Sequence, residues 1–85
     1  MTAKEMFEKL GYKRTDSLLI TSDDLSKCFI DYEKDKTHIT ISSLNGTKSV
    51  CKYSLKLFGI KCVDITIQEL QAINKQLEEL GWLDD

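Results

Sequence analysis

A helix with both a start and a stop signal near the end of the chain constrains the fold more than any other feature. Thr66 and Glu69 have the spacing of a capping box, in which each side chain bonds the free N–H group of the other residue. Gly81 suits the left-handed residue that ends many helices, and the following Trp82 is placed to fold back on the last turn. We therefore expect a helix over 67–80.

The apolar residues of this helix fall on one side. Ile65 and Leu70 occupy the two positions of a hydrophobic staple. The helical period then predicts one buried stripe made of Leu70, Ile73, Leu77 and Leu80.

The start of the chain repeats the same signals on a shorter scale. Thr2 and Glu5 form a second capping-box pair, and Gly11 is followed by an aromatic residue as Gly81 is. We expect a helix at about 2–10 with its apolar residues on one face. A helix this short is unstable alone, so it must pack on another element.

Strict alternation between residues 28 and 42 predicts a β-hairpin. A polar loop at 33–36 would pair Ile30 with Ile39 and Cys28 with Ile41 on one face. The opposite, polar face would then set Asp31 against His38 and Phe29 against Thr40, on a surface exposed to solvent.

Asn45 and Gly46 predict a second hairpin, whose register the pattern leaves in conflict. A two-residue turn would pair Ile41 with Val50 and put Cys51, Tyr53 and Leu55 on the polar face. A three-residue loop with a glycine bulge would pair Ile39 with Cys51 and turn Tyr53 and Leu55 inward. We favour the bulge because it buries more apolar surface.

Two further short strands are expected, at 18–21 and at 60–63 after a turn at Gly59. The chain thus reads as one α+β domain over 1–85, with the order α-β-β-β-β-α. The predicted arrangement is an antiparallel sheet of 3–5 strands with the N- and C-terminal helices packed on one face.

Length and charge limit the functional classes. A chain of 85 residues has little volume for a deep substrate cavity. The net charge of -2 argues against a dedicated nucleic-acid or membrane binder. No signal peptide or membrane-spanning run is visible, and the three cysteines, Cys28, Cys51 and Cys62, lack Cys-x-x-Cys spacing. We expect a cytoplasmic protein with free, mainly buried thiols.

No motif points to catalysis or to a cofactor. His38 is the only histidine, and the expected site for it is a surface pair with Asp31. The cysteines and His38 are too widely spread for a structural zinc site, so we expect no metal. The glycines stand singly, without a phosphate-binding loop. We expect no enzyme activity.

Three features remain as candidate partner contacts: a lysine-bearing strand face, Phe29 on the polar face, and Trp82. Lys48, Lys52 and Lys56 share one strand face, which Lys61 could extend; with Phe29 nearby this could bind single-stranded nucleic acid. The structural alternative is a solvated face whose lysines discourage pairing between sheet edges. Trp82 could anchor a partner, although a helix cap folded onto the core is the favoured interpretation. The candidate set comprises Phe29, His38, Lys48, Lys52 and Trp82.

Residues 2–12 (TAKEMFEKLGY) and 65–82 (ITIQELQAINKQLEELGW) resemble the two ends of small uncharacterised phage and prophage proteins from low-GC Gram-positive bacteria. The resemblance implies a bacterial cytoplasmic setting and a mobile-element origin, and it assigns no site residue. Such proteins often bind a host protein. We therefore expect a non-enzymatic protein-interaction module, capable of self-association, with a nucleic-acid-binding accessory protein as the alternative.

Overall fold

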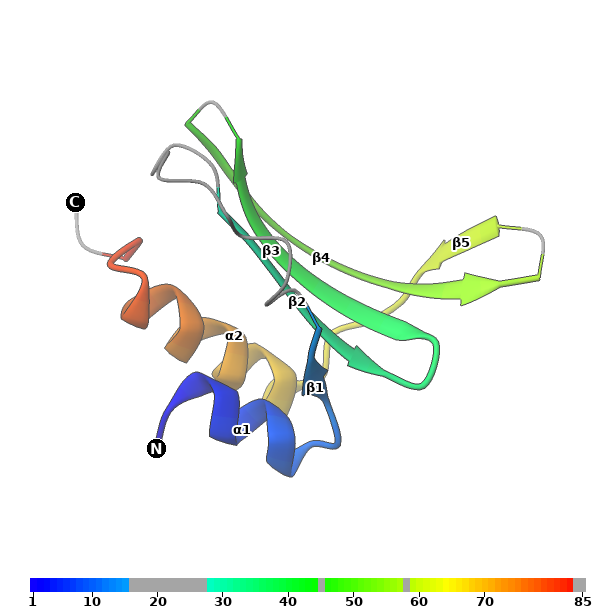
Figure 1. The fold of residues 1–85 in the computed structure, drawn as a ribbon, viewed down its shortest axis with the longest axis horizontal. Helices are drawn as coiled ribbons and strands as arrows, with labels where there is room; N and C mark the ends of the chain where they lie inside the picture. The colour runs from blue at the N-terminus through cyan, green and yellow to red at the C-terminus, as the bar shows by residue number, and fades with distance from the viewer. Residues whose placement is uncertain (16–27, 45, 58, 84–85) are drawn as a thin grey trace. The chain divides into compact units, whose positions relative to one another are not determined.

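The computed structural model describes residues 1–15, 28–44, 46–57 and 59–83. These residues form two compact units, which are the described parts of Met1–Tyr12 with Ile65–Asp85 and the described parts of Lys13–Asp64 (Figure 1). The elements in chain order are α1 (Ala3–Lys9), β1 (Lys13–Arg14), β2 (Cys28–Lys34), β3 (Thr37–Leu44), β4 (Thr47–Lys56), β5 (Gly59–Cys62) and α2 (Ile67–Glu79).

The α+β class and the helix–sheet–helix order are confirmed, and the residues that the structure describes form a sheet of five strands. The packing of both helices on one sheet face stays a prediction, as does a single domain over 1–85. The expected strand at 18–21 lies outside the described residues. β1 was not predicted, because a strand of two residues leaves no period to read.

Both helices begin with the capping boxes that the sequence predicts. Thr2 caps α1 and Thr66 caps α2, and in each case the side chain of the glutamate three residues later accepts from the backbone N–H of the cap. The threonine hydroxyl in turn accepts from the glutamate N–H. Two otherwise unsatisfied donors are therefore bonded at each helix start.

Both helices also end in the same Schellman motif. Gly11 and Gly81 adopt positive φ angles of 94° and 74° just past the last turn. The N–H groups of the following Tyr12 and Trp82 bond the carbonyl groups of Phe7 and Leu77, at 3.0 and 2.9 Å. In the first helix the ring of Tyr12 also packs edge-on against Phe7, with centroids 5.9 Å apart.

Two hydrogen bonds tie α1 and α2 into an antiparallel pair. At one end the Ala3 N–H donates to a Glu79 carboxylate oxygen at 2.8 Å. At the other end the buried Tyr12 hydroxyl donates to Glu69 at 2.5 Å. Burial raises the pKa of Tyr12, and the bond to Glu69 raises it further.

The buried face of α2 differs from the predicted stripe. Ile73 is buried as expected, but Leu70 is 52% exposed and the buried neighbours are Glu69, Ala72 and Gln76. The capping box and the bond from Tyr12 hold Glu69 inward, which turns the adjacent Leu70 toward solvent. A polar residue has thus displaced a leucine from the position that periodicity assigns to it.

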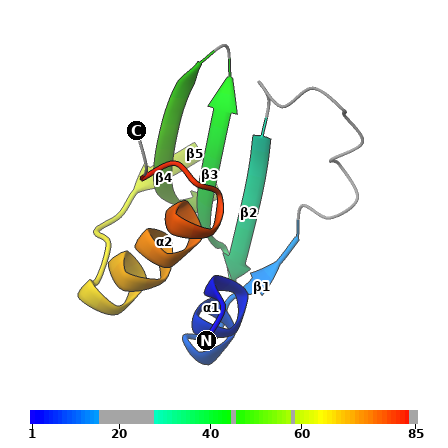
Figure 2. The same ribbon diagram turned by 90° about the vertical axis from the view of Figure 1, so that its left-hand side faces the viewer.

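The strands run antiparallel in the order β1-β2-β3-β4-β5, so each strand pairs with its neighbours in the chain (Figures 1 and 2). In the first long hairpin Ile30 pairs with Ile41 and Tyr32 with Ile39. The predicted pairs were wrong by two residues, because the turn is tighter than the expected loop at 33–36. Only Asp35 and Lys36 connect the strands, with Asp35 at a φ of 56°.

The second hairpin follows the two-residue turn, so the favoured bulge was wrong. Leu44 pairs with Thr47, Ile41 with Val50, and His38 with Tyr53. Gly46 takes the positive φ of 83° that such a turn requires. Burial of apolar surface did not decide this register, because Tyr53 and Leu55 lie on the polar face and not on the inward face that the bulge would give them. The last hairpin confirms a short strand near the predicted 60–63, but this strand, β5, begins at Gly59 itself, which pairs with Lys56 and is therefore not in the turn.

The register divides the sheet into two faces. The isoleucine face carries the buried residues Ile30, Tyr32, Ile39 and Ile41. The same face continues on β4 and β5 through Val50, Lys52, Ser54 and Lys61. The histidine face carries Phe29, Asp31, Glu33, His38 and Thr40, and continues through Cys51, Tyr53, Leu55, Ile60 and Cys62.

Candidate functional site

A buried carboxylate organises the polar part of the histidine face. The Asp31 side chain is 10% exposed and accepts from the His38 Nδ1 atom at 2.9 Å. The hydroxyl groups of Thr15 and Thr40 donate to the same carboxylate at 2.5 and 3.1 Å. Burial of a carboxylate is tolerated when such donors replace its water.

His38 lies between two carboxylates. Its Nδ1 atom bonds Asp31, and its Nε2 atom lies 3.1 Å from the Glu33 carboxylate. The imidazole ring stacks on the Tyr53 ring, with centroids 5.2 Å apart and planes 7° from parallel. The ring is therefore fixed at its two nitrogens and on one of its flat sides.

The predicted proximity of Asp31 and His38 is confirmed, but the predicted exposure was wrong. The His38 side chain is only 14% exposed. The pair is diagonal rather than directly opposed, since His38 pairs with Glu33 and Asp31 pairs with Thr40. Sequence reasoning missed Thr15, whose hydroxyl completes the cluster from just beyond β1.

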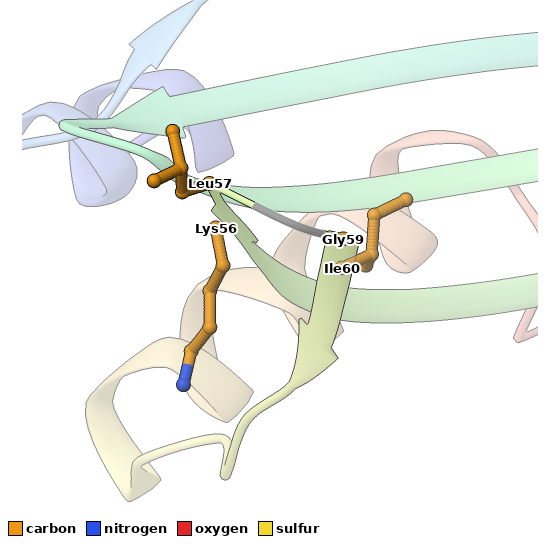
Figure 3. Close-up of a pocket in the computed structure, with 4 residues that line it drawn as sticks. All are labelled: Lys56, Leu57, Gly59 and Ile60. Atoms are coloured by element: carbon orange, nitrogen blue, oxygen red, sulfur yellow. The ribbon is translucent and has the colours of Figure 1, made fainter.

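Exposed apolar residues gather at the tip of the β4–β5 hairpin. Leu55, Leu57 and Ile60 are 42%, 88% and 68% exposed, and we call these three residues the hairpin patch. A shallow hollow open to solvent lies at this tip (Figure 3). Leu57 and Ile60 point to one side of the hairpin and Lys56 points to the other (Figure 3).

Tyr53 connects the polar cluster to the hairpin patch. It stacks on His38 and pairs with Cys62, and the next pair on the same face of the hairpin, two residues along, is Leu55 with Ile60. The anchored histidine ring thus fixes one side of Tyr53, and the exposed patch begins in the next row of the sheet.

Four lysines occupy the isoleucine face of β4 and β5. Lys48, Lys52 and Lys56 share one parity along β4, and Lys61 joins them because it pairs with Ser54. The structure separates these lysines from Phe29, which lies on the histidine face. A basic surface with an interleaved aromatic ring is therefore not assembled.

The predicted contact residues do not form one site. Phe29 and His38 lie on the histidine face, whereas Lys48 and Lys52 lie on the isoleucine face. The Lys52 ammonium donates to the Asp64 carbonyl oxygen at 2.7 Å. Trp82 lies in the helix pair, where its backbone closes the Schellman motif of α2.

The cysteine prediction was partly wrong. Cys51 and Cys62 are exposed free thiols, because the observed register places both on the histidine face. The Cys28 side chain lies outside the described part of the structure. Among the described residues, no group of three or more His, Cys, Asp or Glu side chains is placed to hold a metal ion.

Comparison with protein-family models, with curated proteins and with solved structures gives no match for this chain. In the described part of the chain, neither helix has the length and hydrophobicity needed to span a membrane.

Proposed function

We propose that this chain is a non-enzymatic protein-interaction module that binds through the hairpin patch. The observation that carries the proposal is the exposure of Leu55, Leu57 and Ile60 side by side on one hairpin. Exposed apolar residues scattered singly are ordinary, but neighbouring ones mark interaction surfaces. Each would gain the hydrophobic free energy of burial when a partner covers it.

The polar cluster supports binding rather than catalysis. Both nitrogen atoms of His38 lie against carboxylates of the same sheet, so the ring is engaged by its neighbours rather than turned toward a substrate. The cluster links β2 and β3 and, through the stacked ring of Tyr53, β4. Its proposed role is to hold the sheet rigid beside the patch, which lowers the entropy lost on binding.

We further propose a cytoplasmic location and a phage or prophage origin. The exposed thiols of Cys51 and Cys62 suit a reducing compartment. The origin rests on the resemblance of residues 2–12 and 65–82 to small proteins of that kind.

Affinity capture from a lysate of the source organism tests the interaction proposal. The tagged chain should retain a discrete protein, and the double variant Leu57→Ser, Ile60→Ser should lose it. Ile67→Ser is the matched control, because it removes an exposed isoleucine from the helix pair. Equal retention by the double variant, or a strictly monomeric chain that retains nothing, contradicts the proposal.

A nucleic-acid-binding accessory role is the second candidate, favoured by the shared face of Lys48, Lys52, Lys56 and Lys61. Fluorescence anisotropy of single- and double-stranded DNA against salt concentration tests it. Phosphate contacts are strongest at low salt, so binding should appear there and weaken steeply as salt rises. Absence of binding at low salt ends this candidate.

A further inference from the structure

We infer that the partner adds as a β-strand to the outer edge of β5, and that the added segment alternates apolar and acidic residues. The inference rests on the proposed interaction function and specifies how the partner is recognised. It follows from three properties of this edge: its unpaired backbone, its apolar side chains on one face, and its lysines on the other.

The backbone of β5 presents an open edge. Among the residues that the structure describes, β4 is the only strand paired with β5, which ends the sheet. The Val63 N–H donates to the Lys52 carbonyl, so these two residues form a hydrogen-bonded pair. Hydrogen-bonded and non-hydrogen-bonded pairs alternate along an antiparallel ladder, so Lys61 bonds β4 as Val63 does, and Ile60 and Cys62 do not. The N–H and C=O groups of Ile60 and Cys62 therefore point away from β4, where an added strand can bond them.

The side chains of the edge differ between the two faces. Ile60 and Cys62 lie on the histidine face, beside Leu55 and Tyr53. Lys61 lies on the isoleucine face. Lys56 lies on the same face and pairs with Gly59, which has no side chain. Nothing lies within 4 Å of a Cβ position at Gly59, so a side chain of an added strand can reach Lys56 across it. Residues directly opposed on neighbouring strands have side chains on the same face.

An added strand therefore meets apolar groups and cations at alternate positions. Residues opposite Ile60 and Cys62 bury apolar surface, and the residue opposite Lys61 gains a charge contact if it is acidic. A residue opposite Gly59 reaches Lys56 on the same face. The requirement holds for either strand direction, because side chains alternate between the faces in both.

A second copy of this chain meets the edge less well. Edge lysines oppose pairing of identical strands, and joining two copies at β5 would put both sets of lysines on one continuous face. The same lysines attract an acidic partner strand, so they favour such a partner over a second copy of this chain.

Three synthetic peptides about seven residues long test the inference on the full chain. The first alternates valine and glutamate, the second alternates valine and lysine, and the third has the composition of the first in a shuffled order. Binding is followed by amide chemical shifts and hydrogen exchange. We expect the first peptide to bind at least about fivefold more tightly than either of the others.

The exchange pattern identifies strand addition directly. The amides of Ile60 and Cys62 should become protected, while that of Lys61, which already faces β4, should change little. Protection of neither outward amide, or equal affinity for the shuffled peptide, overturns strand addition. If contact at Leu57 persists without that protection, the interaction function survives and only the strand mode fails.

Charge variants test the acidic preference. Lys61→Glu should reverse the order of the first two peptides, whereas Lys48→Glu should leave it unchanged. Lys48 is a matched control because it lies on the same face but beyond the segment of β4 that pairs with β5. Equal loss in both variants overturns the inference. The inference is also overturned if the amides of Ile60 and Cys62 become protected from exchange when only the concentration of the chain is raised. It is overturned as well if oligothymidine causes a larger chemical-shift change at Lys61 than the acidic peptide does.

Discussion

The β2–β3 hairpin and the β4–β5 hairpin belong to one sheet but use their apolar residues in opposite ways. In β2–β3 the apolar residues of the isoleucine face, among them Tyr32 and Ile39, are buried. In β4–β5 three apolar residues, Leu55, Leu57 and Ile60, are exposed. Similar residue types thus build a core in one hairpin and a candidate interface in the other. The difference teaches that burial, and not composition, separates the two roles.

The largest expected difference comes from shortening one isoleucine in each hairpin. Ile39→Ala should lower the free energy of unfolding by about 2–4 kcal/mol, because it leaves a cavity at a fully buried site. Ile60→Ala, at an exposed site, should change it by less than about 0.5 kcal/mol. Urea unfolding measures both. Losses of similar size would erase the distinction between the hairpins.

A substitution in the buried polar cluster should cause the next largest loss in the free energy of unfolding. Asp31→Ala removes the acceptor of Thr15, Thr40 and His38, so a loss of about 1–3 kcal/mol is expected from the unsatisfied donors. Glu33→Ala is the control, since Glu33 is more exposed and should contribute less than about 1 kcal/mol. If the two losses are equal, the cluster is not organised around Asp31.

A substitution in the helix pair tests whether stability and the hairpin patch are separate. Tyr12→Phe removes the bond to the buried Glu69 and should cost about 1–2 kcal/mol. The same variant should leave peptide binding at β5 unchanged. A parallel loss of binding would show that the patch depends on the helix pair.

The Tyr12 bond also predicts a pH dependence. Burial and Glu69 raise the folded-state pKa of Tyr12, so the neutral hydroxyl stabilises the fold at neutral pH. The stability gap between the wild type and Tyr12→Phe should be constant below about pH 10, the unfolded pKa of tyrosine, and should shrink above it. Urea unfolding between neutral and alkaline pH measures the gap. A gap that widens with pH would contradict the assigned bond.

The smallest expected effect on stability comes from the hairpin patch itself. Leu57→Ser should shift the free energy of unfolding by less than about 0.5 kcal/mol, because the side chain is almost fully exposed. Differential scanning calorimetry checks this value. A clear loss of stability would mean that Leu57 serves the fold rather than a partner.

The sequence was most informative where its signals are local. The pairs Thr2 with Glu5 and Thr66 with Glu69 predicted both helix starts, and Gly11 and Gly81 predicted both ends. Each such signal lies within one helical turn of the boundary that it sets, so no tertiary contact is needed to interpret it.

Pairing between strands was less predictable, for two physical reasons. A shift of two residues leaves every side chain on its own face, so alternation could not exclude the wrong partners of Ile30. In the second hairpin, the assumption of maximal apolar burial turned Tyr53 and Leu55 inward. The two-residue turn through Gly46 decided the register instead, and it left Leu55 exposed.

The candidate site shows the same limit. Asp31 and His38 were predicted as neighbours because one hairpin joins them. Thr15 lies outside this hairpin, just beyond β1, and nothing in its local sequence points to Asp31. The hairpin patch could not be predicted either, because the exposure of Leu55 and Ile60 depends on the register.

Photo-crosslinking at the hairpin patch tests the central claim most directly. A benzoylphenylalanine placed at Leu57 in the full chain, irradiated in cells of the source organism, should give one discrete adduct with another protein. The same group at Lys9, an exposed position at the end of α1, should not give that adduct. No adduct at Leu57, or the same adduct from both positions, would contradict the assignment of the β4–β5 hairpin as the interface.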